Sequence, residues 1–452
     1  MTQGTIWKLL LEFAIPMAIG LLFQQLYNTV DTIVVGQYVG KEALAAVGST
    51  GSIVNMLVGL CAGLSTGAGV VISQCYGAHD YKKLHDAVHT TILLTFILCA
   101  IATGLGIFIV SPMLHFMDTP ADVFPQAKEY LSIYFMGISG LLIYNMGSGI
   151  LRAVGDSRRP LYFLCFSAAV NITFDLLFVV RFGLGIAGVA YATILSQFLS
   201  AILVLFVLTR SDAPYRIQWQ HIGIRMDTLR RILAIGLPSG VQQAITSFSN
   251  VFVQSYINAF GSVCMAGWSS YNKLDIYVLI PVQSIALAST TFVGQNFGAK
   301  NLARARQGVR QALSMSLVVT ALLSGLVILF ARPLISLFTP EQDVIAFGVR
   351  FITIISPFYI LICFNQIFGG ALRGIGKARI PMIVMLSSFV LFRQIYLFVN
   401  RLLGGEFLAV ALAYPAGWVL CSILMTIFYK HSALCAAEPL PIVETEKAPL
   451  QS

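Results

Sequence analysis

The stretch GILRAVGDSRRP at residues 149–160 returns as GALRGIGKARIP at residues 370–381, 221 positions later. Both copies carry Gly-x-Leu-Arg-x-x-Gly, followed by an arginine and a proline at the same spacing. A second pair, QCYGA at residues 74–78 and QNFGA at residues 295–299, recurs at the same offset. Ordered matches at one offset seldom arise by chance, so we infer that the chain contains two similar halves.

The amino-acid composition predicts that both halves lie in a lipid bilayer. The 452 residues are 57% hydrophobic and only 10% charged, whereas soluble domains carry about 25% charged residues. Apolar runs of ~20 residues, long enough to cross a bilayer, recur along the chain. They predict an all-α integral membrane fold with twelve transmembrane helices in two pseudo-symmetric six-helix bundles. The expected spans are residues 8–37, 44–75, 88–111, 126–149, 160–181, 186–209, 229–260, 263–293, 308–331, 343–370, 380–400 and 406–430.

Basic residues are concentrated in alternate loops. When the N-terminus is placed on the basic side, 20 of the 28 lysines and arginines fall on that side and six on the other. Cytoplasmic loops of membrane proteins carry such an excess. We therefore expect a multi-pass protein of the inner (cytoplasmic) membrane with both termini in the cytoplasm. The same asymmetry accounts for the net charge of +9 without nucleic acid as a partner.

The repeat divides the chain into two lobes. Each half has an even number of spans, so both enter the membrane from the same side and form a parallel repeat. Transporters of this design bind solute between the halves and rock one half against the other. The expected parts are an N-terminal six-helix lobe at residues 1–209, a cytoplasmic linker at 210–228, a C-terminal six-helix lobe at 229–430 and a disordered cytoplasmic tail at 431–452.

Charged side chains inside the spans are candidates for function, because an ionisable group is costly to place in lipid. At about 1.5 Å per residue, Asp31, Asp175 and Thr193 all lie about 10 Å below the outer surface. Asn171 lies one turn before Asp175 on the same helix face. This all-oxygen cluster suits a hard cation such as sodium, and paired carboxylates also favour a shared proton. The alternative is that the two aspartates only hydrogen-bond polar neighbours and hold the helices together.

In the second half, the polar candidates inside the spans are Asn250, Lys273, Asp275 and Arg393. Lys273 and Asp275 are two residues apart and therefore do not face the same way on a helix. Either these charges take part in transport, or they neutralise one another within the lobe. No clustered nucleophile and no metal-ligand spacing is found, so we expect no catalytic residue, no cofactor and no metal beyond a transported sodium ion.

Aromatic side chains on the spans are suited to flat organic cations, which they bind by stacking and cation–π contact. The candidates for a substrate cavity are Phe23, Tyr27, Tyr144, Phe248, Tyr256, Tyr271 and Phe364. Pro16 removes a hydrogen bond from the first span and is a candidate hinge.

Together these motifs resemble the multidrug and toxic compound extrusion (MATE) family, over roughly residues 5 to 430. The matching residues are Pro16 with Asn28-x-x-Asp31-Thr32-x-x-Val35-Gly36, the Gly-Ala loops after Gln74 and Gln295, the paired Leu-Arg-x-x-Gly loops, and Asn171-x-x-x-Asp175. The resemblance implies two lobes around a central cavity, and export of amphipathic, often cationic compounds in exchange for sodium or protons. In prokaryotic members of the NorM and DinF type it also implies a cation site in the N-terminal lobe, whose residues fall here on Asp31, Asn171, Asp175 and Thr193.

The seventh span departs from the family pattern. Many members carry an acidic residue there, whereas residues 231–260 contain none. We therefore place the coupling cation in the first lobe. The expected function is secondary active efflux of organic cations and xenobiotics by a monomer, in antiport with sodium or protons. The alternatives are a flippase for a lipid-linked oligosaccharide and an exporter of one specific metabolite.

Overall fold

Nearly all of the chain is helical in the computed structural model, which describes residues 1–117 and 119–435. In chain order the α-helices are α1 (Ile6–Val34), α2 (Lys41–Gly77), α3 (Tyr81–Phe116), α4 (Phe124–Ala153), α5 (Arg158–Asp175), α6 (Gly185–Arg210), α7 (Met226–Asn258), α8 (Ser262–Gly298), α9 (Leu302–Leu329), α10 (Ala331–Ser336), α11 (Gln342–Ile355), α12 (Tyr359–Gly374), α13 (Arg379–Leu386), α14 (Arg393–Leu402), α15 (Phe407–Ala411) and α16 (Ala413–Lys430). The π-helical segments are η1 (Val35–Val39), η2 (Leu176–Arg181) and η5 (Ser387–Phe392), and the 3-10 turns are η3 (Trp219–His221) and η4 (Ser356–Phe358). Of the predicted disordered tail, residues 436–452 lie outside the described residues.

These helices form the twelve expected membrane spans, six in each half. Within the described residues, ten stretches are long and apolar enough to cross a membrane. The helices α7 and α16 fall outside that criterion and occupy the positions of the seventh and twelfth spans. The prediction of an all-α membrane fold with two six-helix bundles is therefore confirmed.

Two helices begin earlier than expected, at Tyr81 and Leu302 instead of residues 88 and 308. Asp80 and Asn301 each accept a hydrogen bond from the backbone N–H three residues later, at 3.1 and 3.0 Å. Such N-caps stabilise a first helical turn. Because hydropathy detects only the apolar part of a span, it misses these polar turns.

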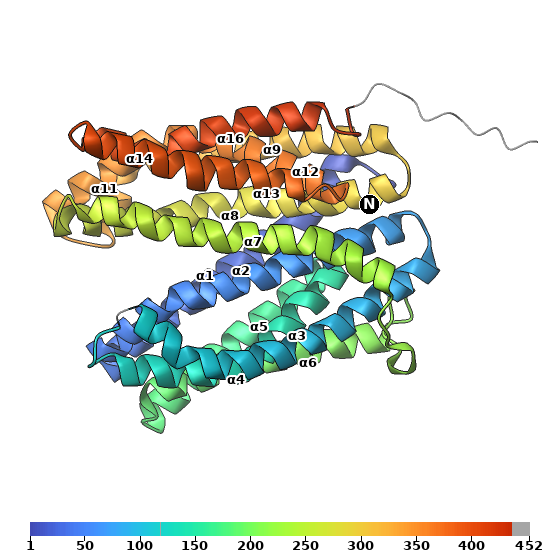
Figure 1. Ribbon diagram of the computed structural model, residues 1–452, viewed down its shortest axis with the longest axis horizontal. Helices are drawn as coiled ribbons and strands as arrows, with labels where there is room; N and C mark the ends of the chain where they lie inside the picture. Colours follow the sequence, from blue (N-terminus) through green and yellow to red (C-terminus); the bar gives the residue numbers. More distant parts are fainter. Residues whose placement is uncertain (118, 436–452) are drawn as a thin grey trace, which may run out of the picture.

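The two lobes lie side by side (Figure 1). Helices α3, α4 and α6 lie on one side of the molecule and α9, α14 and α16 on the other, with α1, α2 and α7 between them. The contact between lobes is made mainly by α2 with α7 and α8, and by α1 with α8. The first lobe is held together mainly by α4 with α3, α6 and α2.

Helix α1 packs in both lobes. Its first half, including Ile6, Leu10 and Phe13, is buried in the same hydrophobic core as Phe292 of the second lobe. Its last residue, Val34, is buried in a core of the first lobe. Helix α1 therefore connects the hydrophobic cores of the two lobes.

Helices α2 and α7 approach each other through glycines. A Cβ atom added at Gly63 would overlap the backbone of Gly240, and one added at Gly67 would overlap that of Gly236. Small residues four positions apart allow membrane helices to pack this closely. The two lobes therefore approach each other closely where Gly63 and Gly67 face Gly240 and Gly236.

Candidate functional site

The lobes exchange hydrogen bonds at the end of the bundle that carries the N-terminus, which we call the proximal end. The side-chain amide of Gln74 in the first lobe donates to the carbonyl of Gly374 in the second, at 2.8 Å. The amide of Gln295 in the second lobe donates to the carbonyl of Ala153 in the first, also at 2.8 Å. We call these two residues the glutamine pair. The contact is reciprocal and closes the proximal end.

Further contacts reinforce the glutamine pair. The Arg231 guanidinium donates to Oε1 of Gln74 at 2.9 Å, and the amine of Met1 donates to Oε1 of Gln295 at 2.8 Å. Burial, and then the nearby Arg304 guanidinium, lower the pKa of the Met1 amine. A cavity of about 30 Å³ lies between the lobes at this level, with room for only one or two water molecules.

Burial of the interface helices decreases toward the opposite end, which we call the distal end. Residues 70–75 of α2 and residues 288–296 of α8 are all buried. Between residues 44 and 60 of α2, most of the described side chains are partly or fully exposed, and none is buried at residues 272–277 of α8. The interface helices are thus closely packed at the proximal end, and their side chains are much more exposed at the distal end.

Three of the four predicted cation-site residues come together in the first lobe. Asp31 lies near the end of α1, and Asn171 and Asp175 lie one turn apart on α5, which packs against α1. The carboxyl groups of Asp31 and Asp175 are close enough to interact electrostatically. Asn171 and Asp175 are buried, with 1% and 0% of their surface exposed. We call these three residues the acidic cluster.

The acidic cluster contains polar atoms without partners. Both carboxyl oxygens of Asp175, both side-chain polar atoms of Asn171 and Oδ1 of Asp31 lack a hydrogen bond within the described part of the chain. Buried polar atoms in proteins are nearly always hydrogen-bonded, so these oxygens and the amide are available to bind a ligand. Two carboxylates with a carboxamide oxygen offer hard oxygen ligands to a sodium ion, and the paired carboxyls are equally suited to a shared proton.

Thr193 and a tyrosine that the sequence did not indicate lie on neighbouring helices. The hydroxyl of Thr193 on α6 donates to the Val189 carbonyl at 3.0 Å, and no hydrogen bond joins it to the acidic cluster among the described residues. Tyr130 on α4 is 9% exposed and close enough to both aspartates to interact with them electrostatically. A tyrosine inside an apolar span was the signal that could have identified it.

Helix geometry changes beside three intramembrane charges. Segment η1 begins four residues after Asp31, η2 begins directly after Asp175, and η5 ends directly before Arg393. π-Helical turns are rare and frequently lie at functional sites. Sequence periodicity contains no signal for them, and none was predicted.

A basic group occupies the interior of the second lobe. Arg393 is 3% exposed. Its guanidinium donates to Oγ of Ser249 at 3.0 Å and to Oδ1 of Asn250 at 2.8 Å, and it lies over the Tyr414 ring, 4.6 Å from the centroid. Two of the four second-lobe candidates, Asn250 and Arg393, thus form one polar network between α7, α14 and α16.

The other two candidates of the second lobe have separate surroundings. Asp275 accepts a hydrogen bond from the Tyr271 hydroxyl at 3.2 Å, and that hydroxyl lies 3.0 Å from the hydroxyl of Tyr359. Lys273 lies over the Phe338 ring, 5.3 Å from its centroid. No ion pair joins the three charged candidates in the described residues, so this geometry does not support their mutual neutralisation.

The aromatic candidates for the substrate cavity have different surroundings. Phe23 and Phe248 are 42% and 58% exposed, and Tyr27 lies near Asp31 on α1. Tyr271 is only 3% exposed, and its hydroxyl donates a hydrogen bond to Asp275. The three remaining candidates pack against hydrophobic cores and are Tyr144, Tyr256 and Phe364.

The candidate hinge lies within a continuous helix, because α1 runs unbroken through Pro16. This proline separates the half of α1 that packs on the second lobe from the half that carries Asp31.

Comparison with known proteins identifies relatives across both halves. The MatE family model matches residues 16–177 and again residues 238–399. The chain is 31% identical over 397 residues to the probable multidrug resistance protein YpnP of Bacillus subtilis (strain 168), covering 87% of this chain and 88% of that protein. It is 27% identical over 393 residues to the probable multidrug resistance protein NorM of Thermotoga maritima, covering 84% and 82%.

A solved structure has the same fold. An outward-facing conformation of a multidrug resistance MATE family transporter matches with a TM-score of 0.90 and 24% identity, over 95% of this chain and 96% of that chain.

Proposed function

This chain belongs to the MatE family, and we propose that it exports amphipathic organic cations in exchange for sodium ions or protons bound at the acidic cluster. It is a multi-pass membrane transporter and not an enzyme. The observation that carries the proposal is the set of buried, unpartnered oxygens on Asp31, Asn171 and Asp175. We expect the functional unit to be a monomer in the inner membrane.

Helix α1 supplies the route from cation to lobe movement. A cation bound by Asp31 and Asp175 neutralises their mutual repulsion and draws the distal half of α1 toward α5. The proximal half of α1 is buried in the second lobe, so a change in the packing of α1, with Pro16 as its hinge, acts on both lobes. Exchange needs only that cation and substrate prefer different lobe arrangements.

Substrate would bind between the lobes on exposed aromatic faces. Phe23 on α1 and Phe248 on α7 are exposed, and these helices lie in the central layer of the molecule (Figure 1). Tyr27 lies one turn from both Phe23 and Asp31, so cation binding and substrate binding would act on the same helix. Aromatic faces hold organic cations by stacking and cation–π contact.

The charge distribution supports a cytoplasmic proximal end. The helix ends here carry Lys82 and Lys83 in the first turn of α3, and Arg158 and Arg159 at the start of α5. Basic loops remain in the cytoplasm, so the distal end, where the lobes are less covered, would face outward.

The test is efflux of ethidium from proteoliposomes, with sodium and pH gradients imposed separately. Efflux driven by one gradient establishes antiport and identifies the cation. Asp31→Asn should abolish that dependence, whereas Glu12→Gln, an exposed carboxylate on the same helix, should leave it unchanged. Efflux that responds to neither gradient, or a fully coupled Asp31→Asn variant, would show that the proposal is wrong.

A further inference from the structure

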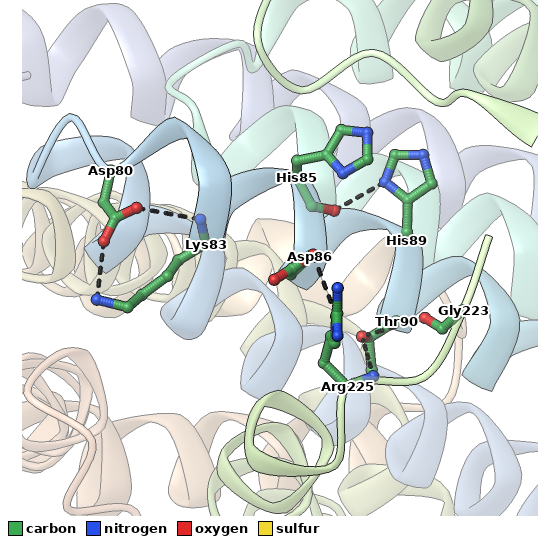
Figure 2. Close-up of polar contacts among 8 residues, drawn as sticks. All are labelled: Asp80, Lys83, His85, Asp86, His89, Thr90, Gly223 and Arg225. Atoms are coloured by element: carbon green, nitrogen blue, oxygen red, sulfur yellow. Dashed lines mark hydrogen bonds and ion pairs between the residues drawn. The ribbon is translucent and has the colours of Figure 1, made fainter. Parts of the chain in front are cut away.

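The segment between the lobes is fastened to the first lobe. The backbone N–H of Gln218 donates to Nε2 of His89 on α3 at 2.9 Å, and that of Arg225 donates to Oγ1 of Thr90 at 3.1 Å. The Arg225 side chain pairs with Asp86 at 3.6 Å. Figure 2 shows Arg225 and Gly223 of this segment beside His89, Thr90 and Asp86 of α3. The linker therefore follows α3, and α7 begins at the next residue.

A cavity of about 450 Å³ lies between the linker and α3. Its charged and titratable lining is Lys82, His85, Asp86, His89, His221 and Arg225. We call it the linker pocket. The four α3 residues recur at positions three or four apart, which places them on one face of the helix.

The linker pocket presents more donors than acceptors. Asp86 is its one carboxylate and is engaged by Arg225. His89 uses both ring nitrogens, because Nδ1 donates to the carbonyl of His85 and Nε2 accepts from the linker. Within the described residues, no hydrogen bond or ion pair engages the side chain of Lys82 or the rings of His85 and His221, and the Arg225 guanidinium has only its contact with Asp86.

These unengaged donors favour an anion over a metal ion. The described histidines and acids form no group that could hold a metal. Lys82 and Arg225 supply ammonium and guanidinium donors, and such N–H groups, together with those of imidazole, bind phosphate oxygens.

The position of the pocket favours a membrane lipid as the source of the phosphate. Helix α3 has 36 residues and is about 54 Å long, whereas the hydrocarbon core of a bilayer is about 30 Å thick. The helix is therefore long enough for its first turns, which carry Lys82 to His89, to reach the headgroup layer. Trp219 of the linker and Phe96 of α3 are 53% and 36% exposed, with ring centroids 6.4 Å apart, and exposed tryptophan is typical of the membrane interface.

We propose that the linker pocket binds the phosphate headgroup of an anionic phospholipid. The phosphate contacts Lys82, His221 and Arg225, while Trp219 packs against the upper acyl chain. A bound headgroup draws linker and α3 together, which restrains the start of α7 and thus the second lobe.

The test compares phosphatidylglycerol with phosphatidylcholine on the purified full-length protein. Phosphatidylglycerol should raise the melting temperature at saturable, low concentrations. Removing two basic groups with Lys82→Gln/Arg225→Gln should weaken its apparent affinity roughly 25-fold, about fivefold per charge. The matched control is Lys83→Gln/Arg216→Gln, which removes one lysine paired with Asp80 and one linker arginine bound to the Thr209 carbonyl, both outside the pocket.

A second measurement uses the unmodified pocket, so it stands even where a double variant does not fold. Brominated phosphatidylglycerol should quench tryptophan fluorescence more than brominated phosphatidylcholine does, and the difference should vanish in Trp219→Phe. Equal quenching by both lipids, or an equal loss of affinity in the control variant, would overturn the proposal. Displacement of the lipid by equimolar glycerol 1-phosphate would identify a soluble anion as the ligand and would overturn it as well.

Discussion

The two lobes share a fold but differ in the chemistry of their interiors. In the first lobe, Asp175 is fully buried and has no hydrogen-bond partner among the described residues. In the second, Arg393 donates two hydrogen bonds through Nη2 and stacks on Tyr414, while its Nε lacks a partner among the described residues. Tyr414 stands 221 positions after Thr193, the offset of the internal repeat. Equivalent regions thus carry acids in the first lobe and a base in the second.

The difference lies in partners as much as in charge. A buried charge that has its partners contributes to the architecture of the lobe, whereas one that lacks them destabilises the protein until a ligand arrives. Unpaired groups that persist in a structure are typical of functional sites. We therefore expect substitutions in the two lobes to affect stability and coupling in opposite ways.

The largest effect is expected for Asp175→Asn. It removes a buried carboxylate and retains its shape, so coupling to the cation gradient should fall about 100-fold, while the melting temperature stays equal or rises. Proteoliposome efflux and thermal unfolding of the same preparation measure both quantities. A variant that loses stability and keeps its response to the gradient would contradict our assignment of cation coupling to the first lobe.

Arg393→Met should show the opposite pattern. Oδ1 of Asn250 loses its donor, Oγ of Ser249 keeps only the donor Gln394, and the Tyr414 ring loses its cation. We expect this to cost about 2 kcal/mol of unfolding free energy. The dependence of efflux on sodium or pH should remain. The same two assays apply, and loss of the ion response here would show that the second lobe takes part in coupling.

Asp275→Asn tests whether any carboxylate within the membrane spans would support coupling to the cation gradient. Asp275 accepts a hydrogen bond from Tyr271, and replacing the charged acceptor by a neutral one should cost about 1 kcal/mol. Thermal unfolding should record this small loss, with the ion response of efflux unchanged. A loss of coupling as large as that of Asp175→Asn would remove the distinction between partnered and unpartnered acids.

The smallest effect is expected for Thr193→Val. Its hydroxyl donates to the Val189 carbonyl and contributes at most one further oxygen ligand. The cation concentration that gives half-maximal efflux should therefore rise about fivefold. Tyr414→Phe, at the equivalent position of the second lobe, is the matched control and should leave this cation concentration unaltered. Ion titrations of the efflux rate compare the two, and equal shifts would exclude Thr193 as a ligand.

Much of this arrangement could be predicted from the sequence, because repeat offsets and hydropathy are properties of residue order. The spans, the two lobes and the proximity of Asp31 to Asp175 follow from counting residues along helices. The position of Tyr130 does not, because it depends on how α4 rotates against its neighbours. The π-helical turns beside Asp31, Asp175 and Arg393 are also absent from any periodic pattern, since they arise from backbone adjustment to packing.

The glutamine pair has a consequence for the origin of the chain's architecture. Gln74 holds a carbonyl of the second lobe and Gln295 holds the matching carbonyl of the first. Mutual contact of this kind defines the isologous interface of a two-fold symmetric homodimer. Here such an interface is enclosed in one polypeptide. The covalent connection replaces a bimolecular association by an intramolecular one with a high effective concentration. In the transport cycle that we propose, the glutamine pair would therefore re-form without a search for a partner, and each half is free to specialise.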